Sequence, residues 1–246
     1  MTILKQIDFE VADFGELALP PIDVPGYASA IHSLEPLAYW RLGEQSGTTF
    51  ADQMGNDPLS FTGTHPLGQD GALLTDNDDA VLLDGVRAQT SGSVLPAGTG
   101  DPFSIAFWIR VPPGSINGGP FLGQFFSNIS GHARIILDDD GRLRFLVTDE
   151  SNFYSAEVVS ETWRVVVLTR SASGVIRWYF DGQLDTQASG HDTAIFPTKF
   201  TVGALTSNLS VVYLDELAVF DEALSLDQVR WLNGLGLGQL ALPTGL

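Results

Sequence analysis

Two parts of the sequence carry oxygen-bearing side chains that could hold a divalent cation. Asp52, Asn56 and Asp57 surround a glycine turn, and Asp215 lies among apolar residues much later in the chain. Hard cations such as Ca²⁺ prefer carboxylate, amide and carbonyl oxygens, and a carboxylate that is buried without a partner is costly. The sequence therefore predicts a Ca²⁺ site built from these four residues. In the alternative, Asn56 and Asp57 cap a turn, while Asp215 accepts hydrogen bonds from a turn or from Arg41.

A second set of residues could bind carbohydrate. Trp108 and Arg110 alternate with the apolar residues of one expected strand, and Arg142 and Arg144 alternate with those of another. Alternate strand positions share a face of the sheet, and aromatic rings offer flat apolar surfaces on which sugar rings can stack. We expect these four residues to line a polar, concave face that binds a glycan. In the alternative, a loop or the N-terminal segment covers Trp108.

Catalytic residues are not expected. The sequence has no Cys and no Gly-x-Ser-x-Gly motif, and its four histidines lack the helical spacing of a metal hydrolase. A glycosidase needs two carboxylates that flank the scissile bond. Asp215 and Glu216 are adjacent, and adjacent strand residues point to opposite faces of a sheet. We therefore expect that they do not act as a pair and that the protein is not an enzyme.

Short strands are the elements that must position these residues. Residues 103–111 alternate between apolar and more polar side chains, and Asp140-Gly141 and Asp181-Gly182 each separate two strand-like segments, as in a type I′ hairpin. A capping box at residues 225–228 predicts one short C-terminal helix that stops at Asn233-Gly234. Many short strands and one helix predict an all-β fold, an antiparallel two-sheet jelly-roll sandwich.

Length and charge limit the kinds of protein that this chain can be. Its 246 residues are 44% hydrophobic, which fits one large β-domain and excludes a disordered chain. Thirty acidic and twelve basic side chains give a net charge of −18, which argues against nucleic-acid and anionic membrane partners. No apolar run reaches the ~20 residues of a membrane helix, and residues 1–8 do not resemble a signal peptide.

The N-terminal segment differs from the rest of the chain. Residues 1–35 contain the proline-rich stretch 19–26 and several spaced apolar residues, which predicts an extended arm or linker. We expect this arm to dock the domain onto a structural protein of a virion or cell surface, or onto a neighbouring copy. A flexible tail is the alternative. Residues 36–236 are expected to form the sandwich, and residues 237–246 a C-terminal tail.

Four motifs, in order, resemble those of laminin-G-like domains of the concanavalin A-like lectin and glucanase class. The motifs are Ala38–Asp52, Phe103–Ile109, Trp163–Val167 with Trp178–Gly182, and Tyr213–Ser225. The resemblance covers roughly residues 36–236. It implies two stacked antiparallel sheets, a concave face and, in many members, a Ca²⁺ site at the rim. Members are mostly adhesive or carbohydrate-binding modules, although the fold also hosts glycosidases.

These observations together predict a non-enzymatic adhesion or glycan-binding module. Such domains usually act outside cells, and a tailed-phage virion protein can reach that setting by lysis rather than export. We therefore expect a virion decoration or tail-associated protein that contacts host surface carbohydrate. The alternatives are a bacterial cell-surface or secreted carbohydrate-binding module and, behind that, a glycoside hydrolase. Whether the protein forms oligomers stays open.

Overall fold

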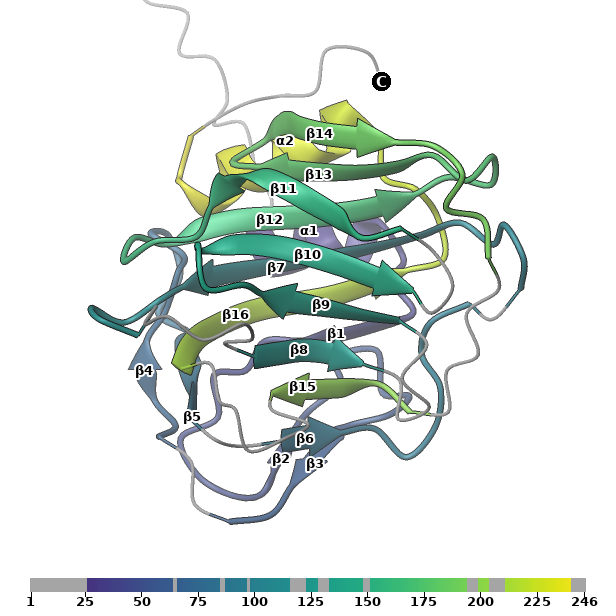
Figure 1. Cartoon of the computed structure of the whole chain (residues 1–246). Helices are drawn as coiled ribbons and strands as arrows, with labels where there is room; N and C mark the ends of the chain where they lie inside the picture. The colour runs from purple at the N-terminus through teal and green to yellow at the C-terminus, as the bar shows by residue number, and fades with distance from the viewer. Residues whose placement is uncertain are drawn as a thin grey trace, which may run out of the picture.

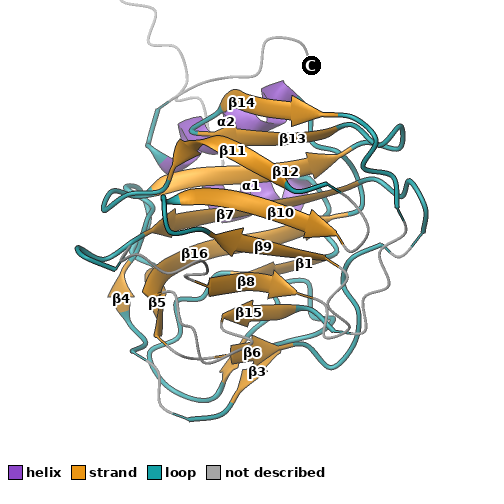
Figure 2. Cartoon of the chain, in the orientation of Figure 1, coloured by secondary structure: helices purple, strands orange, loops and turns teal. Residues whose placement is uncertain are grey.

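The computed structural model of the chain describes residues 26–63, 66–84, 87–96, 98–115, 123–127, 133–147, 151–193, 199–203 and 211–239. In this part of the chain, two antiparallel β-sheets are stacked face to face (Figure 1). Two helices, α1 (Tyr27–Ser33) and α2 (Leu226–Gly236), lie on the outer side of one sheet (Figure 2). The predicted all-β sandwich is therefore confirmed.

Sheet A is the sheet that carries the two helices. Its strand order is β14-β13-β12-β7-β16-β5-β4, and β1 also pairs with β16. Its strands are β1 (Ala38–Trp40), β4 (Gln69–Asp70), β5 (Asp79–Asp84), β7 (Phe103–Arg110), β12 (Arg164–Arg170), β13 (Ile176–Phe180), β14 (Gln183–Ala188) and β16 (Val211–Phe220).

Sheet B covers the opposite side of the core, with the order β11-β10-β9-β8-β15-β6-β3-β2. Its strands are β2 (Thr49–Phe50), β3 (Leu59–Phe61), β6 (Arg87–Gln89), β8 (Gly123–Ser127), β9 (Ala133–Leu137), β10 (Arg142–Val147), β11 (Phe153–Val158) and β15 (Thr201–Gly203).

The core between the sheets follows the alternation of the sequence. Phe103, Ile105, Phe107 and Ile109 of β7 all point into it. Both predicted hairpins form, β9–β10 and β13–β14. At the tip of the second, Asp181 and Gly182 have φ angles of 47° and 77°, as a type I′ turn requires. In the first hairpin only Gly141 has a positive φ, so this turn is of another type.

A second hydrophobic cluster lies on the outer side of sheet A, beneath the helices. Tyr27 and Ile31 of α1 and Leu232 of α2 pack there against Trp108 and Phe220. The expectation that residues 1–35 form an extended arm is thus wrong for residues 27–33, because burial of Tyr27 and Ile31 makes this stretch a packed helix. Residues 1–25 lie outside the described residues.

Helix α2 begins as expected and ends later than expected. The hydroxyl of Ser225 accepts a hydrogen bond from the Gln228 amide, and the Gln228 side chain accepts one from the Ser225 amide. The helix continues past Asn233 and Gly234 to Gly236. A Cβ atom on Gly236 would lie 2.2 Å from the Trp108 ring, so this glycine permits close contact between α2 and sheet A.

No described helix is long and apolar enough to cross a membrane.

Candidate functional site

Asp52 is used to hold the backbone of its own turn. Its Oδ1 accepts hydrogen bonds from the amides of Tyr39 and Met54 at 2.9 and 3.0 Å. Its Oδ2 accepts hydrogen bonds from the amides of Asn56 and Asp57 at 2.9 and 3.0 Å. Four N–H groups therefore occupy both oxygens of this carboxylate, which is a structural role and not the predicted metal-binding one.

The two residues that follow in the turn are also engaged. The Asn56 side chain donates to the Leu37 carbonyl at 3.1 Å. The carboxylate of Asp57 accepts hydrogen bonds from the amides of Ser91 and Gly92, both at 2.8 Å, and from the Ser91 hydroxyl at 3.0 Å. Asp57 thus holds the turn at residues 91–92, whereas the Asn56 side chain bonds the chain just before β1 rather than capping a turn. The structure thus corrects the predicted four-residue ligand set.

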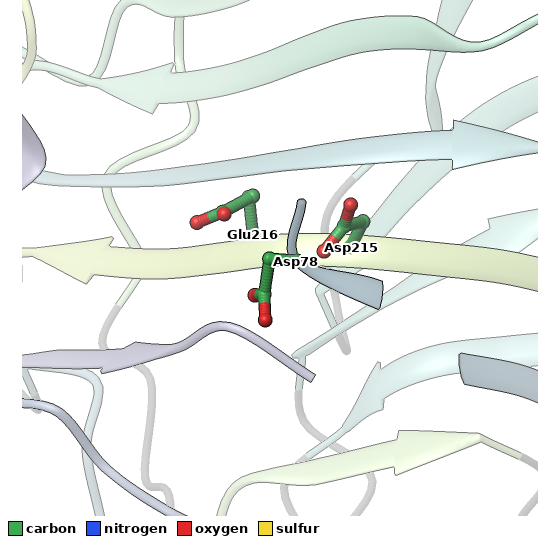
Figure 3. A group of neighbouring side chains, drawn as sticks. All are labelled: Asp78, Asp215 and Glu216. Carbon is green, nitrogen blue, oxygen red and sulfur yellow. The ribbon is translucent and has the colours of Figure 1, made fainter. Parts of the chain in front are cut away.

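Asp215 instead lies in a different acidic group, formed with Asp78 and Glu216 (Figure 3). Each of these three residues offers a carboxylate oxygen, and the three oxygens lie within 4.8 Å of one another. Asp215 and Glu216 come from β16 and are only 1% and 0% exposed. Asp78 directly precedes β5 and is half-buried. We call Asp78, Asp215 and Glu216 the acidic cluster.

A bulge in β16 brings the two adjacent carboxylates to the same side of sheet A. Asp215 pairs with Trp108, but the next pair along β7 is Ala218 with Ala106, so β16 has one extra residue there. Glu216 occupies it with a φ of 52°, a left-handed conformation that is uncommon outside glycine. The expectation that Asp215 and Glu216 point to opposite faces is therefore wrong, because strand alternation does not hold across a bulge.

Arg41 and Tyr39 are the main partners of Glu216. The Nε and one terminal nitrogen of Arg41 donate to Glu216 Oε1 at 3.1 and 2.8 Å, and the Tyr39 hydroxyl donates to Glu216 Oε2. Arg41 also forms ion pairs with Asp76 at 2.7 Å and Asp78 at 3.0 Å. The single positive charge of Arg41 is thus shared among the carboxylates of Asp76, Asp78 and Glu216, and it neutralises them only in part. Asp215 is not among the partners of Arg41.

Asp215 has a partner for only one of its two oxygens. Oδ2 accepts a hydrogen bond from the Ala72 amide at 2.8 Å, whereas Oδ1 is buried without a hydrogen-bond partner among the described residues. Burial, and next the charge of Glu216, raise the pKa of Asp215 well above its usual value. Burial also raises the pKa of Glu216 to about 7, although Arg41 and Tyr39 act in the opposite direction. Charging both acids at once is therefore unfavourable unless a cation is nearby.

The surroundings of the acidic cluster fit a hard divalent cation. Its donors are all oxygens, and Asp215 Oδ1 is an unpaired, buried acceptor among them. Two glycines let the backbone approach Asp78 closely. A Cβ on Gly71 would lie 2.1 Å from the Asp78 carbonyl, and a Cβ on Gly43 would lie 2.2 Å from Asp78 Oδ1. Larger residues at 43 or 71 would fill this space.

The residues predicted to bind a glycan do not share one face. Trp108 is 1% exposed and lies beneath α1, with its ring 6.2 Å from that of Tyr27 in an edge-on arrangement. Its predicted role as an open stacking platform is thus corrected, because the N-terminal helix covers it. Arg142 and Arg144 lie on the outer side of sheet B, on the other side of the core from Trp108.

Arg142 and Arg144 meet at one aromatic ring. Their guanidinium carbons lie 4.9 and 5.7 Å from the centroid of Tyr154. Arg142 is paired with Asp140 at 2.6 Å, and Arg144 is paired with Asp138 at 2.9 Å. Each positive charge is therefore already matched by a carboxylate of the same hairpin.

Arg110 belongs to a different arrangement at the end of β7. Its guanidinium carbon lies 4.0 Å from the ring centroid of Tyr213 and 5.1 Å from that of Trp163. The two rings lie 6.3 Å apart in an edge-on arrangement, and all three side chains are half-buried. We call Arg110, Trp163 and Tyr213 the aromatic–arginine surface. Sequence reasoning missed Trp163 and Tyr213, because only the cross-strand pairing places Tyr213 opposite Arg110.

A pocket lies next to these residues along the chain. Its volume is about 280 Å³, and it forms between two loops that are joined by a hydrogen bond from the Val111 amide to the Ser160 carbonyl at 2.7 Å. One loop directly follows Arg110, the last residue of β7. The other loop comes just before Trp163, which itself precedes β12. The pocket is lined by Val111, Pro112, Gly114, Val159, Ser160 and Glu161.

Comparison with protein families identifies the sandwich. The model of the concanavalin A-like lectin/glucanases superfamily matches residues 78–230, which is more than half of the chain. The chain belongs to this family. No curated protein matches the sequence.

Solved structures with a similar fold include botulinum neurotoxin binding domains. The serotype D binding domain is 13% identical, with a TM-score of 0.63, and the match covers 80% of this chain and 51% of that one. A serotype D ligand-binding domain in complex with N-acetylneuraminic acid is 14% identical, with a TM-score of 0.63 and coverages of 83% and 52%. This concanavalin A-like domain therefore spans about half the length of these neighbours, and at such identity the likeness concerns the fold.

The acidic cluster of this concanavalin A-like domain is poorly placed for hydrolysis. A glycosidase needs its acid and its nucleophile or base in contact with substrate. Asp215 and Glu216 are buried on the outer side of sheet A, where Arg41 and Tyr39 donate hydrogen bonds to Glu216. The arrangement is suited to holding a cation or to structural bonding rather than to attack on a sugar.

Proposed function

We propose that the protein is a non-enzymatic glycan-binding module that binds through the aromatic–arginine surface. The observation that carries this proposal is a half-buried arginine held by two half-buried aromatic rings. The segments next to Arg110 and Trp163 in the sequence also line a pocket of about 280 Å³. Aromatic faces pack against the apolar side of a sugar ring, while polar groups fix its hydroxyls. Family membership supports the proposal, since the superfamily includes lectins.

A glycan array tests this proposal with variants on opposite faces of the sandwich. Trp163→Ala removes one ring of the aromatic–arginine surface, and Tyr154→Ala removes a comparable half-buried ring beside Arg142 on sheet B. We expect Trp163→Ala to lower glycan affinity at least tenfold and Tyr154→Ala to leave it unchanged. The reverse result would place the site on sheet B, and an array without any bound glycan would contradict the proposed function.

The same proposal states that the protein does not hydrolyse glycans, and a separate measurement tests this. Incubation with a broad panel of polysaccharides should retain sugar on the protein without releasing reducing ends. Sustained release that is lost in both Asp215→Asn and Glu216→Gln would instead assign hydrolysis to the acidic cluster.

We also propose that the acidic cluster holds a structural Ca²⁺ ion. Asp78, Asp215 and Glu216 would supply its carboxylate oxygens, and the unpaired Oδ1 of Asp215 supports this assignment. Bound Ca²⁺ would add positive charge to the acidic cluster, where the single charge of Arg41 faces several carboxylates. Asp52, Asn56 and Asp57 have no part in the site as now proposed, because their side chains bond backbone groups at Asn56, Leu37 and Gly92.

The location that we propose is a tailed-phage virion, where the module would contact host carbohydrate. The proline-rich segment before the sandwich supports it, since such a segment could attach the domain to a larger structure. Co-sedimentation of the protein with phage particles from its native source tests this location. Recovery with the bacterial envelope in the absence of phage would favour a cell-surface module.

A further inference from the structure

We propose that the ligand of the aromatic–arginine surface is an acidic sugar, one whose carboxylate is bound by Arg110. This inference rests on the proposed glycan-binding function and adds the chemical class of the ligand. It rests on the hydrogen bonds and ion pairs that Arg110 does and does not make, in a protein whose net charge of −18 disfavours the binding of anions in general.

Arg110 has no acidic partner among the described residues, although acidic residues exceed basic ones by more than two to one. Its Nε is buried and makes no hydrogen bond there. A buried donor without an acceptor costs free energy, and more so when it is charged. Five other arginines pair with carboxylates; these are Arg41, Arg142, Arg144, Arg164 and Arg230. Arg170 and Arg177 instead donate to a carbonyl and to an amide oxygen.

The contacts that Arg110 does make leave its hydrogen-bond donors unused. The rings of Tyr213 and Trp163 attract the guanidinium through their π faces, with its carbon 4.0 and 5.1 Å from their centroids. Such contacts fix the orientation of the group without consuming N–H donors, of which arginine has five. A guanidinium held in this way is preorganised for an acceptor that the protein itself does not provide.

A carboxylate is the acceptor that matches this geometry best. It binds the fork of a guanidinium through two parallel hydrogen bonds, and charge-assisted bonds are roughly twice as strong as neutral ones. The half-buried rings beside Arg110 give the apolar side of the same sugar a surface to pack on. Arg110 would thus bind the acidic group of the sugar, while the rings of Trp163 and Tyr213 contact its apolar side.

The experiment compares acidic and neutral glycans on wild-type protein, Arg110→Gln and Arg142→Gln. Arg142→Gln is the matched control, because it removes an arginine beside an aromatic ring on the opposite sheet. We expect wild-type protein to prefer glycans that end in uronic or sialic acids, and Arg110→Gln to lose at least tenfold in affinity for them. Affinity for neutral glycans should change little, and circular dichroism should show that both variants fold.

Two further measurements separate the possible outcomes. Arg110→Lys keeps the charge without the planar fork, so an intermediate affinity for acidic glycans is expected. Esterification of the sugar carboxylate should weaken binding as much as Arg110→Gln does. Equal binding of acidic and neutral glycans, unaffected by Arg110→Gln, would overturn the inference and leave the proposed function intact. If no glycan binds at all, the proposed function fails and this inference fails with it.

Discussion

Glu216 shows how a single backbone angle changes what the neighbouring side chains can do. In a regular strand Asp215 and Glu216 would be separated by the sheet, with one of them in the core. The left-handed conformation at Glu216 turns both carboxylates outward, between the inward-pointing Leu214 and Leu217. A non-glycine residue in this conformation carries a small energetic cost, which the bonds from Arg41 and Tyr39 to Glu216 help to offset.

The Asp215→Asn variant, which removes the charge of this residue, tests whether the acidic cluster binds Ca²⁺. For wild-type protein, Ca²⁺ at a hundredfold excess over its Kd should stabilise the fold by about 2.7 kcal/mol, because it binds only the folded state. Asp215→Asn should abolish this gain and should raise the melting temperature in chelator, since it relieves repulsion with Glu216. Asp84→Asn, an exposed residue at the end of β5, is the control and should keep the full response.

Calorimetry with and without EDTA provides the measurement, and elemental analysis provides an independent one. Identical melting curves for wild-type protein in Ca²⁺ and in EDTA, together with no bound metal, would exclude the site. The acidic cluster would then have a structural role that involves no metal.

At the scale of elements, helix α1 has the largest effect on the binding surfaces. It turns the outer side of sheet A from an open platform into a second core, with Tyr27 and Ile31 packed over Trp108. The aromatic–arginine surface, at the end of β7, lies on the same face, and its three side chains are half-buried rather than buried.

Tyr27→Ala measures how strongly α1 is attached. The side chain is 1% exposed, and loss of a fully buried aromatic residue typically costs about 3–5 kcal/mol. We expect a clear fall in the urea midpoint, because packing of α1 against Trp108 is lost. Ser29→Ala, at an exposed position of the same helix, should change the midpoint little. A midpoint unchanged in Tyr27→Ala would mean that the helix contributes nothing to stability.

Local patterns in the sequence predicted the elements whose geometry is fixed locally. The alternation of β7, the two hairpins and the capping box of α2 all depend on residues a few positions apart. The acidic cluster does not: Asp78 reaches Asp215 only through the pairing of β5 with β16, and the bulge leaves no local signature. Trp163, Tyr213 and Arg110 likewise come from three strands. The glycan-binding prediction placed side chains on the correct side of each strand but could not say which outer face is covered.

At the scale of the whole molecule, the packed part of the chain includes helix α1 and so does not begin at residue 36. The sandwich with both helices accounts for the described residues from 26 onward, whereas residues 1–25 contain Ile3, Ile7, Phe9, Val11 and Phe14. We predict that these residues dock the domain onto a partner or a neighbouring copy, by strand addition or in an apolar groove.

Deletion of residues 1–25 tests this docking without removing α1. The truncated protein should keep its melting temperature and its glycan affinity, and should lose assembly as measured by light scattering or by co-sedimentation with its partner. Deletion through residue 33 is the contrasting variant, and it should also lower stability because Tyr27 and Ile31 are removed. If the shorter deletion still assembles normally, the contact lies elsewhere on the domain.

The position of β16 has a consequence for how the protein is made. This strand is among the last parts of the domain to leave the ribosome, yet it pairs with β1, β5 and β7. Until residue 220 has emerged, those three strands present unpaired edges, and the longest-range contacts of the fold cannot form. A high contact order slows folding, and exposed edges favour aggregation in the meantime. We therefore expect the domain to fold only after β16 has emerged, with nascent chains that end before residue 211 remaining sensitive to protease and dependent on chaperones.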